Sequence, residues 1–171
     1  MNADYSHQRQ LKDNLLHAWD ALFAQFGRFT EIQAQAIEPL LAGQNCMLVS
    51  ATASGKTEAA LAPLIELLKQ DKKAAGNLSI LCLIPTQALA RDLARRLEQP
   101  LGKLALRLQV KTGDDTALNA NRPPELLLTT PESFDSLLTK MPRIFKDLRT
   151  ARLSRNPLMS RASCAHSTVA R

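Results

Sequence analysis

The sequence has few aromatic residues and no long apolar run. Aromatics make up 4% of its 171 residues, so Ala, Leu and Ile supply most of the apolar content, which suits helices packed on a sheet. No apolar run approaches the roughly 20 residues that a membrane span needs. The polar start MNADYSHQRQLKDN also lacks an apolar signal core. We therefore expect a cytoplasmic protein with no membrane partner.

Closely spaced cysteines are also missing. The three cysteines, Cys46, Cys82 and Cys164, lie far apart and do not have the spacing of metal ligands. Cys46 and Cys82 fall inside apolar runs, which predicts buried free thiols in a reducing compartment.

Acidic residues are absent after Asp147. The net charge is +6, and five of these charges come from five arginines in residues 148–171, a segment without a carboxylate. A basic end of this kind is weak evidence for a nucleic-acid partner. The overall charge therefore does not identify the function.

Apolar segments of strand length alternate with segments of helical period. Glycines and capping residues separate them. The pattern predicts helices over 6–26, 31–43, 56–70, 86–99 and 132–141, and strands over 45–50, 78–85, 104–113 and 125–131. This alternation predicts an α/β fold in which right-handed crossovers build a parallel sheet flanked by helices. Ligands of such sheets bind at the carboxyl ends of the strands.

The stretch SATASGKT, residues 50–57, matches the phosphate-binding pattern G-x-x-x-x-G-K-[ST] except at Ser50. Lys56 would reach the β- and γ-phosphates of ATP and the Thr57 hydroxyl would ligate Mg²⁺. Ser50, in place of the first glycine, must adopt the backbone angle that the turn demands. The alternative is an ordinary helix start with a solvated Lys56. The residues predicted to contact the nucleotide in this loop are Thr52, Ala53, Ser54, Gly55, Lys56 and Thr57.

Further stretches, taken in order, resemble motifs of superfamily 2 helicases. FTEIQ resembles the Q motif, IPTQALARDL resembles motif Ia, and TGDD and TTPES resemble motifs Ib and Ic. The sequence is most similar to the DEAD/DEAH-box enzymes of the Lhr-like and Ski2-like branches, over roughly residues 20–150. The resemblance implies the N-terminal portion of the first RecA-like domain of an ATP-dependent helicase.

This resemblance implies roles for particular residues. Gln33 would contact adenine, and Lys56 and Thr57 would be the catalytic residues that hold the phosphates and Mg²⁺. Small hydroxyls and free N–H groups at helix starts bind phosphates without reading bases. The implied partner is a single strand of DNA or RNA, and the subgroup favours DNA. The implied nucleic-acid contacts are Pro85, Thr86, Gly113, Thr130 and Pro131.

Each of these residues also has a purely structural interpretation. Thr86 and Thr130 are good helix caps whatever their function. Gln33 could lie on a helix surface. Trp19 and Phe26 could stack on adenine, as upstream aromatics do in relatives, but we favour packing in the core for both.

The acidic motif of this family is missing. ATP hydrolysis by this design needs an Asp that positions Mg²⁺ and a Glu that orients water. In the family they form D-E-x-[HD] at the end of a hydrophobic strand. Here ARLSRNPLMS is polar and contains Pro157, so we expect neither the motif nor its strand. Asp135 and Asp147 lie too early to substitute. We therefore expect nucleotide binding without turnover.

We interpret the chain as a helical lead-in over 1–28, a partial RecA-like ATP-binding domain over 29–147 and an atypical basic tail over 148–171. Three rival classes stay open. A small P-loop kinase or other NTPase would need a lid and a substrate acid, and neither is visible. A non-catalytic nucleotide-binding module would retain binding, whereas a purely structural fragment would show no thermal shift with ATP and Mg²⁺. The sequence does not specify an oligomeric state.

The codons of Leu158, Met159 and Ser160 suggest why the acids are missing. The codon of Met159 is ATG. If the Leu158 codon ends in G and the Ser160 codon is AGC or AGT, reading from that final G gives GAT-GAG, which encodes Asp-Glu. That pair would lie about thirty residues after Thr129. We hypothesise that a frameshift near residue 152 replaced the native continuation. The alternatives are coincidence and a genuine or designed end.

We predict that an alternative reading frame of the gene encodes a hydrophobic strand, Asp-Glu and then helicase-like sequence. Sequencing the gene and its flanks tests this directly. The hypothesis fails if neither alternative frame encodes them.

Overall fold

A computed structural model describes residues 2–71, 76–113, 118–145 and 149–152 of the chain. Residues up to Leu67 belong to one compact unit, and the described residues from Leu68 to 152 form a second. Within the described ranges, no helix combines the length and the apolar character needed to cross a membrane.

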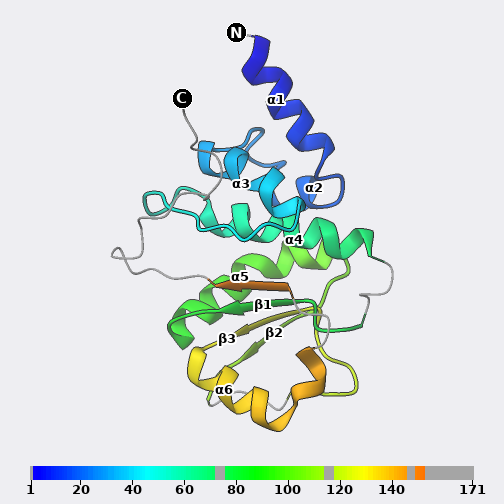
Figure 1. Ribbon diagram of the computed structural model, residues 1–171, viewed down its shortest axis with the longest axis vertical. Helices are drawn as coiled ribbons and strands as arrows, with labels where there is room; N and C mark the ends of the chain where they lie inside the picture. Colours follow the sequence, from blue (N-terminus) through cyan, green and yellow to red (C-terminus); the bar gives the residue numbers. More distant parts are fainter. Residues whose placement is uncertain (1, 72–75, 114–117, 146–148, 153–171) are drawn as a thin grey trace. The chain divides into compact units, whose positions relative to one another are not determined.

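The second unit is built on a parallel sheet with the strand order β2-β3-β1-β4. Each neighbouring pair runs parallel. Helix α5 (Gln87–Lys103) covers one face, and α6 (Pro131–Lys140) with the short 3-10 helix η1 (Pro142–Phe145) lies on the other (Figure 1). The predicted α/β class, a parallel sheet flanked by helices, is confirmed. The strands are β1 (Ile80–Leu83), β2 (Leu108–Lys111), β3 (Leu126–Thr129) and β4 (Arg149–Arg152).

The two central strands are buried on both faces, as expected for a sheet between helices. On one face, Leu81 and Leu127 pack with Leu137 of α6 and Ile144 of η1. Helix α5 contacts β2 and β3. It buries apolar residues that recur three or four positions apart, which is the spacing of one helix face. These residues are Ala90, Leu93, Leu97 and Leu101.

Strand β4 corrects the expectation that no strand follows Asp147. Residues 149–152 pair in parallel with β1 along its whole length, from Ile80↔Arg149 to Leu83↔Arg152. The expectation relied on the polar side chains of this region. Backbone N–H and C=O groups do not depend on side-chain polarity, so the edge of β1 can pair with a polar segment.

Residues 45–50, NCMLVS, were predicted to form a buried strand, and that prediction is wrong. They have no strand conformation and are not part of the described sheet. Met47 is 50% exposed. A strand is stable where its backbone groups pair with a neighbour, and apolar composition alone does not supply that neighbour.

The first unit contains α1 (Asn2–Asp13), α2 (Ala18–Leu22), α3 (Glu31–Leu41) and the start of α4 (Lys56–Gln70). The single helix predicted over 6–26 is therefore divided in two. The cause is Glu66, a fully buried residue of α4. Its carboxylate accepts hydrogen bonds from the backbone N–H groups of His17 (2.8 Å) and Ala18 (3.0 Å), and it lies 2.8 Å from His17 Nδ1. The carboxylate thus satisfies free N–H groups where α2 begins.

Three aromatic rings pack together in this unit. Phe29 lies edge-on to Trp19 and Phe23, with ring centroids 4.8 and 4.9 Å apart, and the Lys12 ammonium lies 4.9 Å from the Trp19 ring centroid. Trp19 is buried, as the core interpretation expects. Phe26 is 62% exposed, so the core interpretation is wrong for that residue.

The cysteines differ in exposure. Cys82 in β1 is fully buried, and burial raises the pKa of its thiol to about 12. Cys46 is half-buried, which corrects the prediction of two buried thiols. Cys164 lies outside the described residues.

Glu125 joins segments at the amino ends of β2 and β3. Its side chain is nearly buried and accepts hydrogen bonds from the backbone N–H groups of Gly76 (3.0 Å) and Arg107 (2.9 Å). The Arg107 guanidinium donates to the same carboxylate at 2.9 Å. Burial alone would raise the pKa of Glu125, but the Arg107 side chain and the backbone donors together lower it below its usual value.

We predict that Glu125→Gln lowers the free energy of unfolding by about 1–3 kcal/mol at pH 7, the usual cost of weakening bonds to a buried charged group. A lowered folded-state pKa stabilises the fold above the unfolded pKa of about 4.3, and this contribution is lost as the pH falls through the folded value. Urea unfolding at pH 7, 5 and 3.5 should therefore show the gap between wild type and variant narrowing with acidification. Asp135→Asn, at an exposed position of α6, is the control. A gap independent of pH would contradict the prediction.

Candidate functional site

The loop of residues 50–57 leads directly into α4, which begins at Lys56. In the part of the chain that the structure describes, the N–H groups of residues 52–57 and the Thr57 hydroxyl have no hydrogen-bond acceptor. A run of free donors at a helix start, where the helix dipole is positive, binds anions. The loop therefore has the donor set that a polyphosphate needs.

Lys56 is held inside this loop. Its ammonium donates to the carbonyl oxygen of Ser50 at 2.8 Å and also to that of Ala51. The hydroxyls of Ser50 and Ser54 lie 2.5 Å apart beside it. The alternative of a solvated Lys56 is therefore wrong. Phosphate oxygens are acceptors of the same kind as these carbonyls and could take their place on the ammonium.

Two residues of the loop, Ala53 and Gly55, have left-handed backbone angles, with φ of +60° and +86°. Glycine adopts this region freely, whereas alanine pays a steric cost there. We expected the special backbone angle at Ser50, because Ser50 replaces the first glycine of the pattern. Ser50 is not among the described residues with positive φ, so the strained position is Ala53.

Thr30 and Gln33 of the α3 start clamp the loop. The Gln33 side chain accepts from the Thr30 N–H (2.9 Å) and donates to the Gly55 carbonyl (3.3 Å), while the Thr30 hydroxyl donates to the Ser54 carbonyl (3.0 Å). Gln33 is 5% exposed, so the helix-surface interpretation is wrong. Both ends of its amide are engaged, and contact with adenine would require one of these bonds to be exchanged.

The predicted nucleic-acid residues gather in the second unit. They follow the carboxyl ends of the three parallel strands β1, β2 and β3. The Ile84 N–H donates to the Thr129 carbonyl at 2.8 Å, which joins the ends of β1 and β3. The Thr129 hydroxyl donates to the Lys111 carbonyl at 2.5 Å, which ties β3 to β2. All five except Thr130 are exposed: Pro85, Thr86, Gly113 and Pro131.

The two threonines differ in detail. Thr86 caps α5 by accepting from the Leu89 N–H at 3.3 Å, and it remains exposed. Thr130 is 7% exposed, and its hydroxyl lies 3.2 Å from that of Ser133 without a side-chain capping bond. The capping interpretation is thus correct for the Thr86 side chain and wrong for that of Thr130.

Among the residues that the structure describes, no three His, Cys, Asp or Glu side chains form a group that could hold a metal ion. Asp135 lies exposed on α6, and Asp147 falls outside the described residues. Thr57 therefore remains the candidate Mg²⁺ ligand of this chain.

Sequence reasoning missed the bonds that link the loop to its surroundings. The pattern of helices and strands does not predict that the Thr30 hydroxyl donates to Ser54. A signal was present, because T-x-x-Q from Thr30 to Gln33 is a capping-box pattern that fixes both side chains at the helix start. The Ser50–Ser54 contact had no such signal.

A parallel sheet flanked by helices, preceded by a phosphate loop that opens a helix, defines the class of RecA-like P-loop domains. The model of the DEAD/DEAH box helicase family matches residues 30–153. The chain belongs to this family.

Curated relatives and solved structures agree. The ATP-dependent helicase Lhr-Core of Methanothermobacter thermautotrophicus is 33% identical over 159 residues, which span 81% of this chain and 18% of that protein. The DUF1998 helicase MrfA bound to DNA and AMPPNP has a TM-score of 0.66 at 23% identity, over 82% of this chain and 20% of the other. The RNA-helicase Prp28 from Chaetomium thermophilum bound to ADP has a TM-score of 0.68 at 19% identity, over 93% of this chain and 40% of that chain. The chain thus spans less than half of each.

We predict that two substitutions in the loop differ in their cost to stability. Gly55→Ala places a Cβ 2.2 Å from Gln33 Nε2 at φ +86°, so it should lower the free energy of unfolding by more than about 1 kcal/mol. Ala53→Gly relieves left-handed strain while adding unfolded-state entropy, so the two effects nearly cancel, within about 0.5 kcal/mol. Chemical unfolding followed by circular dichroism measures both. Equal losses would show that the Gln33 contact does not constrain Gly55.

Proposed function

We propose that this chain is the ATP-binding portion of the first RecA-like domain of an ATP-dependent helicase that acts on nucleic acid. In this proposal, Lys56 and the N–H groups of residues 52–57 hold the phosphates. Thr57 ligates Mg²⁺ and Gln33 contacts adenine after exchanging one of its present bonds. The observation that carries the proposal is the run of free N–H groups around Lys56 at the start of α4.

Nucleic-acid binding is proposed at the strand ends of the second unit. Exposed Thr86 and Gly113 present a hydroxyl and an unshielded backbone, which suit phosphate contacts without base reading. MrfA was solved with DNA, whereas Prp28 is an RNA helicase. The preference for DNA rests on the resemblance to the Lhr-like branch.

We further propose that this chain binds nucleotide without turning it over. Residues 148–171 contain no carboxylate, so this stretch supplies no Asp-Glu pair to position Mg²⁺ and orient water. The family match ends at residue 153, next to the hypothesised change of reading frame near residue 152. Because the match continues to residue 153 and β4 occupies residues 149–152, the atypical tail proposed here follows this strand instead of beginning at residue 148.

A non-catalytic nucleotide-binding module is the second candidate. It is favoured by a loop that matches the phosphate-binding pattern except at Ser50, in a chain without the acidic pair. The two candidates differ in the second unit, because a helicase portion should bind single strands at Thr86 and Gly113 and a nucleotide module should not. The kinase alternative has no further observation in its favour.

We predict weak binding of ATP with Mg²⁺ that Lys56→Ala reduces at least tenfold, because the ammonium is the one side-chain cation of the loop. Titration calorimetry measures binding, and phosphate release with single-stranded DNA or RNA measures turnover, which should be negligible. Lys103→Ala, at an exposed position at the end of α5, is the matched control. Equal affinity of Lys56→Ala and wild type would overturn the nucleotide site. Hydrolysis that depends on Lys56 would overturn the claim of binding without turnover.

A further inference from the structure

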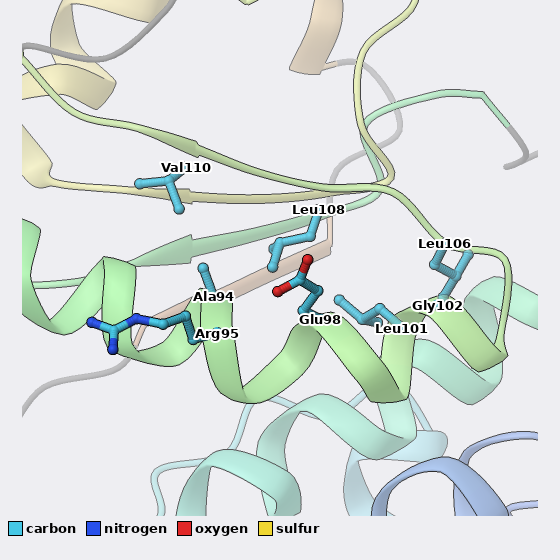
Figure 2. Close-up of a pocket in the computed structure, with 8 residues that line it drawn as sticks. All are labelled: Ala94, Arg95, Glu98, Leu101, Gly102, Leu106, Leu108 and Val110. Carbon is cyan, nitrogen blue, oxygen red and sulfur yellow. The ribbon is translucent and has the colours of Figure 1, made fainter.

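A groove of about 350 Å³ lies between α5 and the strand β2. Figure 2 shows Leu101 on α5, Leu106 on the loop that follows this helix, and Leu108 and Val110 on the strand side. None of the proposed nucleotide or nucleic-acid residues lines it. The groove is therefore a feature that the proposed function does not use.

One wall of the groove is the outermost strand of the described sheet. The Leu126 N–H donates to the Arg107 carbonyl at 3.1 Å, so Arg107 faces β3. Alternate residues of a parallel strand face the same neighbour. The N–H and C=O groups of Leu108 and Val110 therefore face outward, and within the described residues they have no hydrogen-bond partner. An open edge of this kind is a template for another strand.

The other wall carries two charged side chains, Arg95 and Glu98. Arg95 and Glu98 lie three positions apart on α5, and neither makes an ion pair or hydrogen bond within the described residues. In Figure 2 the Glu98 carboxylate is directed from α5 toward the strands beside Leu108, whereas Arg95 extends away from it. The groove therefore combines an apolar floor, a free backbone edge and a central carboxylate.

We propose that this groove binds an extended segment of a partner protein, which adds to β2 as a further strand. Its backbone pairs with the outward groups of Leu108 and Val110. Alternate apolar side chains enter the groove, and a lysine or arginine lies opposite Glu98. This is recognition by strand addition, in which main-chain bonds supply affinity and pockets supply specificity.

The chemistry of the groove favours a polypeptide over a nucleic acid. A nucleic acid would bring phosphates toward Glu98, which repels them, and has no backbone that alternates donors and acceptors as a strand does. A polypeptide strand satisfies both the open edge and the apolar floor. The proposal is independent of the nucleotide site.

Phage-displayed random nonapeptides selected on the full chain test the proposal. We expect enriched peptides with alternating apolar residues and a lysine or arginine. Gly102 lines the groove, and a Cβ added there meets nothing within 4 Å, so Gly102→Leu has room for its Cβ and adds an apolar side chain at the groove. Enriched peptides should bind this variant at least tenfold more weakly by fluorescence anisotropy, and they should bind Glu98→Lys more weakly as well. Gln99→Leu, at an exposed neighbouring position of α5 outside the groove lining, should bind as wild type does.

Amide hydrogen exchange then identifies the binding mode. The bound peptide should slow exchange at Leu108 and Val110, while Gln109, which faces β3, stays unchanged. Backbone N-methylation of the peptide should abolish binding. The proposal fails if no peptide is enriched, or if peptides bind Gly102→Leu and wild type equally well. It also fails if a single-stranded oligonucleotide, instead of a peptide, slows amide exchange at Leu108 and Val110. Slowed exchange at these residues in the chain alone at high concentration would also overturn it, because the occupant would then be a second copy of the chain.

Discussion

The parallel pairing of β1 with β3 is the interaction on which the rest of the described sheet depends. These strands lie in the middle of the order β2-β3-β1-β4, so each outer strand has one of them as its neighbour. Their register aligns Leu83 with Thr129, and β2 places Lys111 beside the same threonine. Three strand ends therefore meet at one edge, and the loops that carry the proposed nucleic-acid contacts leave from it. If this pairing slipped by one residue, the side chains of β3 would exchange faces and the edge would lose its alignment.

The sequence predicted well the elements whose own side chains determine their conformation and burial. Strands β1 and β3 are uninterrupted apolar runs, and α5 has a periodic apolar face and a threonine cap, so local pattern and burial agree. The errors arose where the structure of a segment depends on backbone pairing or on residues distant in the sequence. Residues 149–152 pair because β1 has an open edge, and residues 45–50 form no strand despite their apolar composition.

The split of the first predicted helix has a cause 49 positions away in the sequence, the bond from His17 N–H to Glu66. Periodicity cannot reveal such a partner. The signal that was present is an acidic residue within the apolar face of α4. In the loop of residues 50–57, the pattern singled out Lys56 and Thr57 as candidate phosphate and Mg²⁺ ligands. It did not predict which groups these side chains contact in the folded chain. Carbonyl oxygens of the loop accept from the Lys56 ammonium, whereas the N–H groups of residues 52–57 have no acceptor within the described residues. The donors of this loop are thus unequally satisfied.

The buried thiol of Cys82 has a practical consequence for studying this sheet. With a pKa of about 12, roughly one thiol in ten thousand is ionised at pH 8, and the thiolate is the species that reacts with alkylating reagents. Two factors therefore protect Cys82 from alkylation in the folded strand: reagents cannot reach the buried sulfur, and the thiol is not ionised. The rate of Cys82 alkylation would therefore report how often the sheet around β1 opens. The alkylation rate of the half-buried Cys46 would serve as an internal reference in the same molecule.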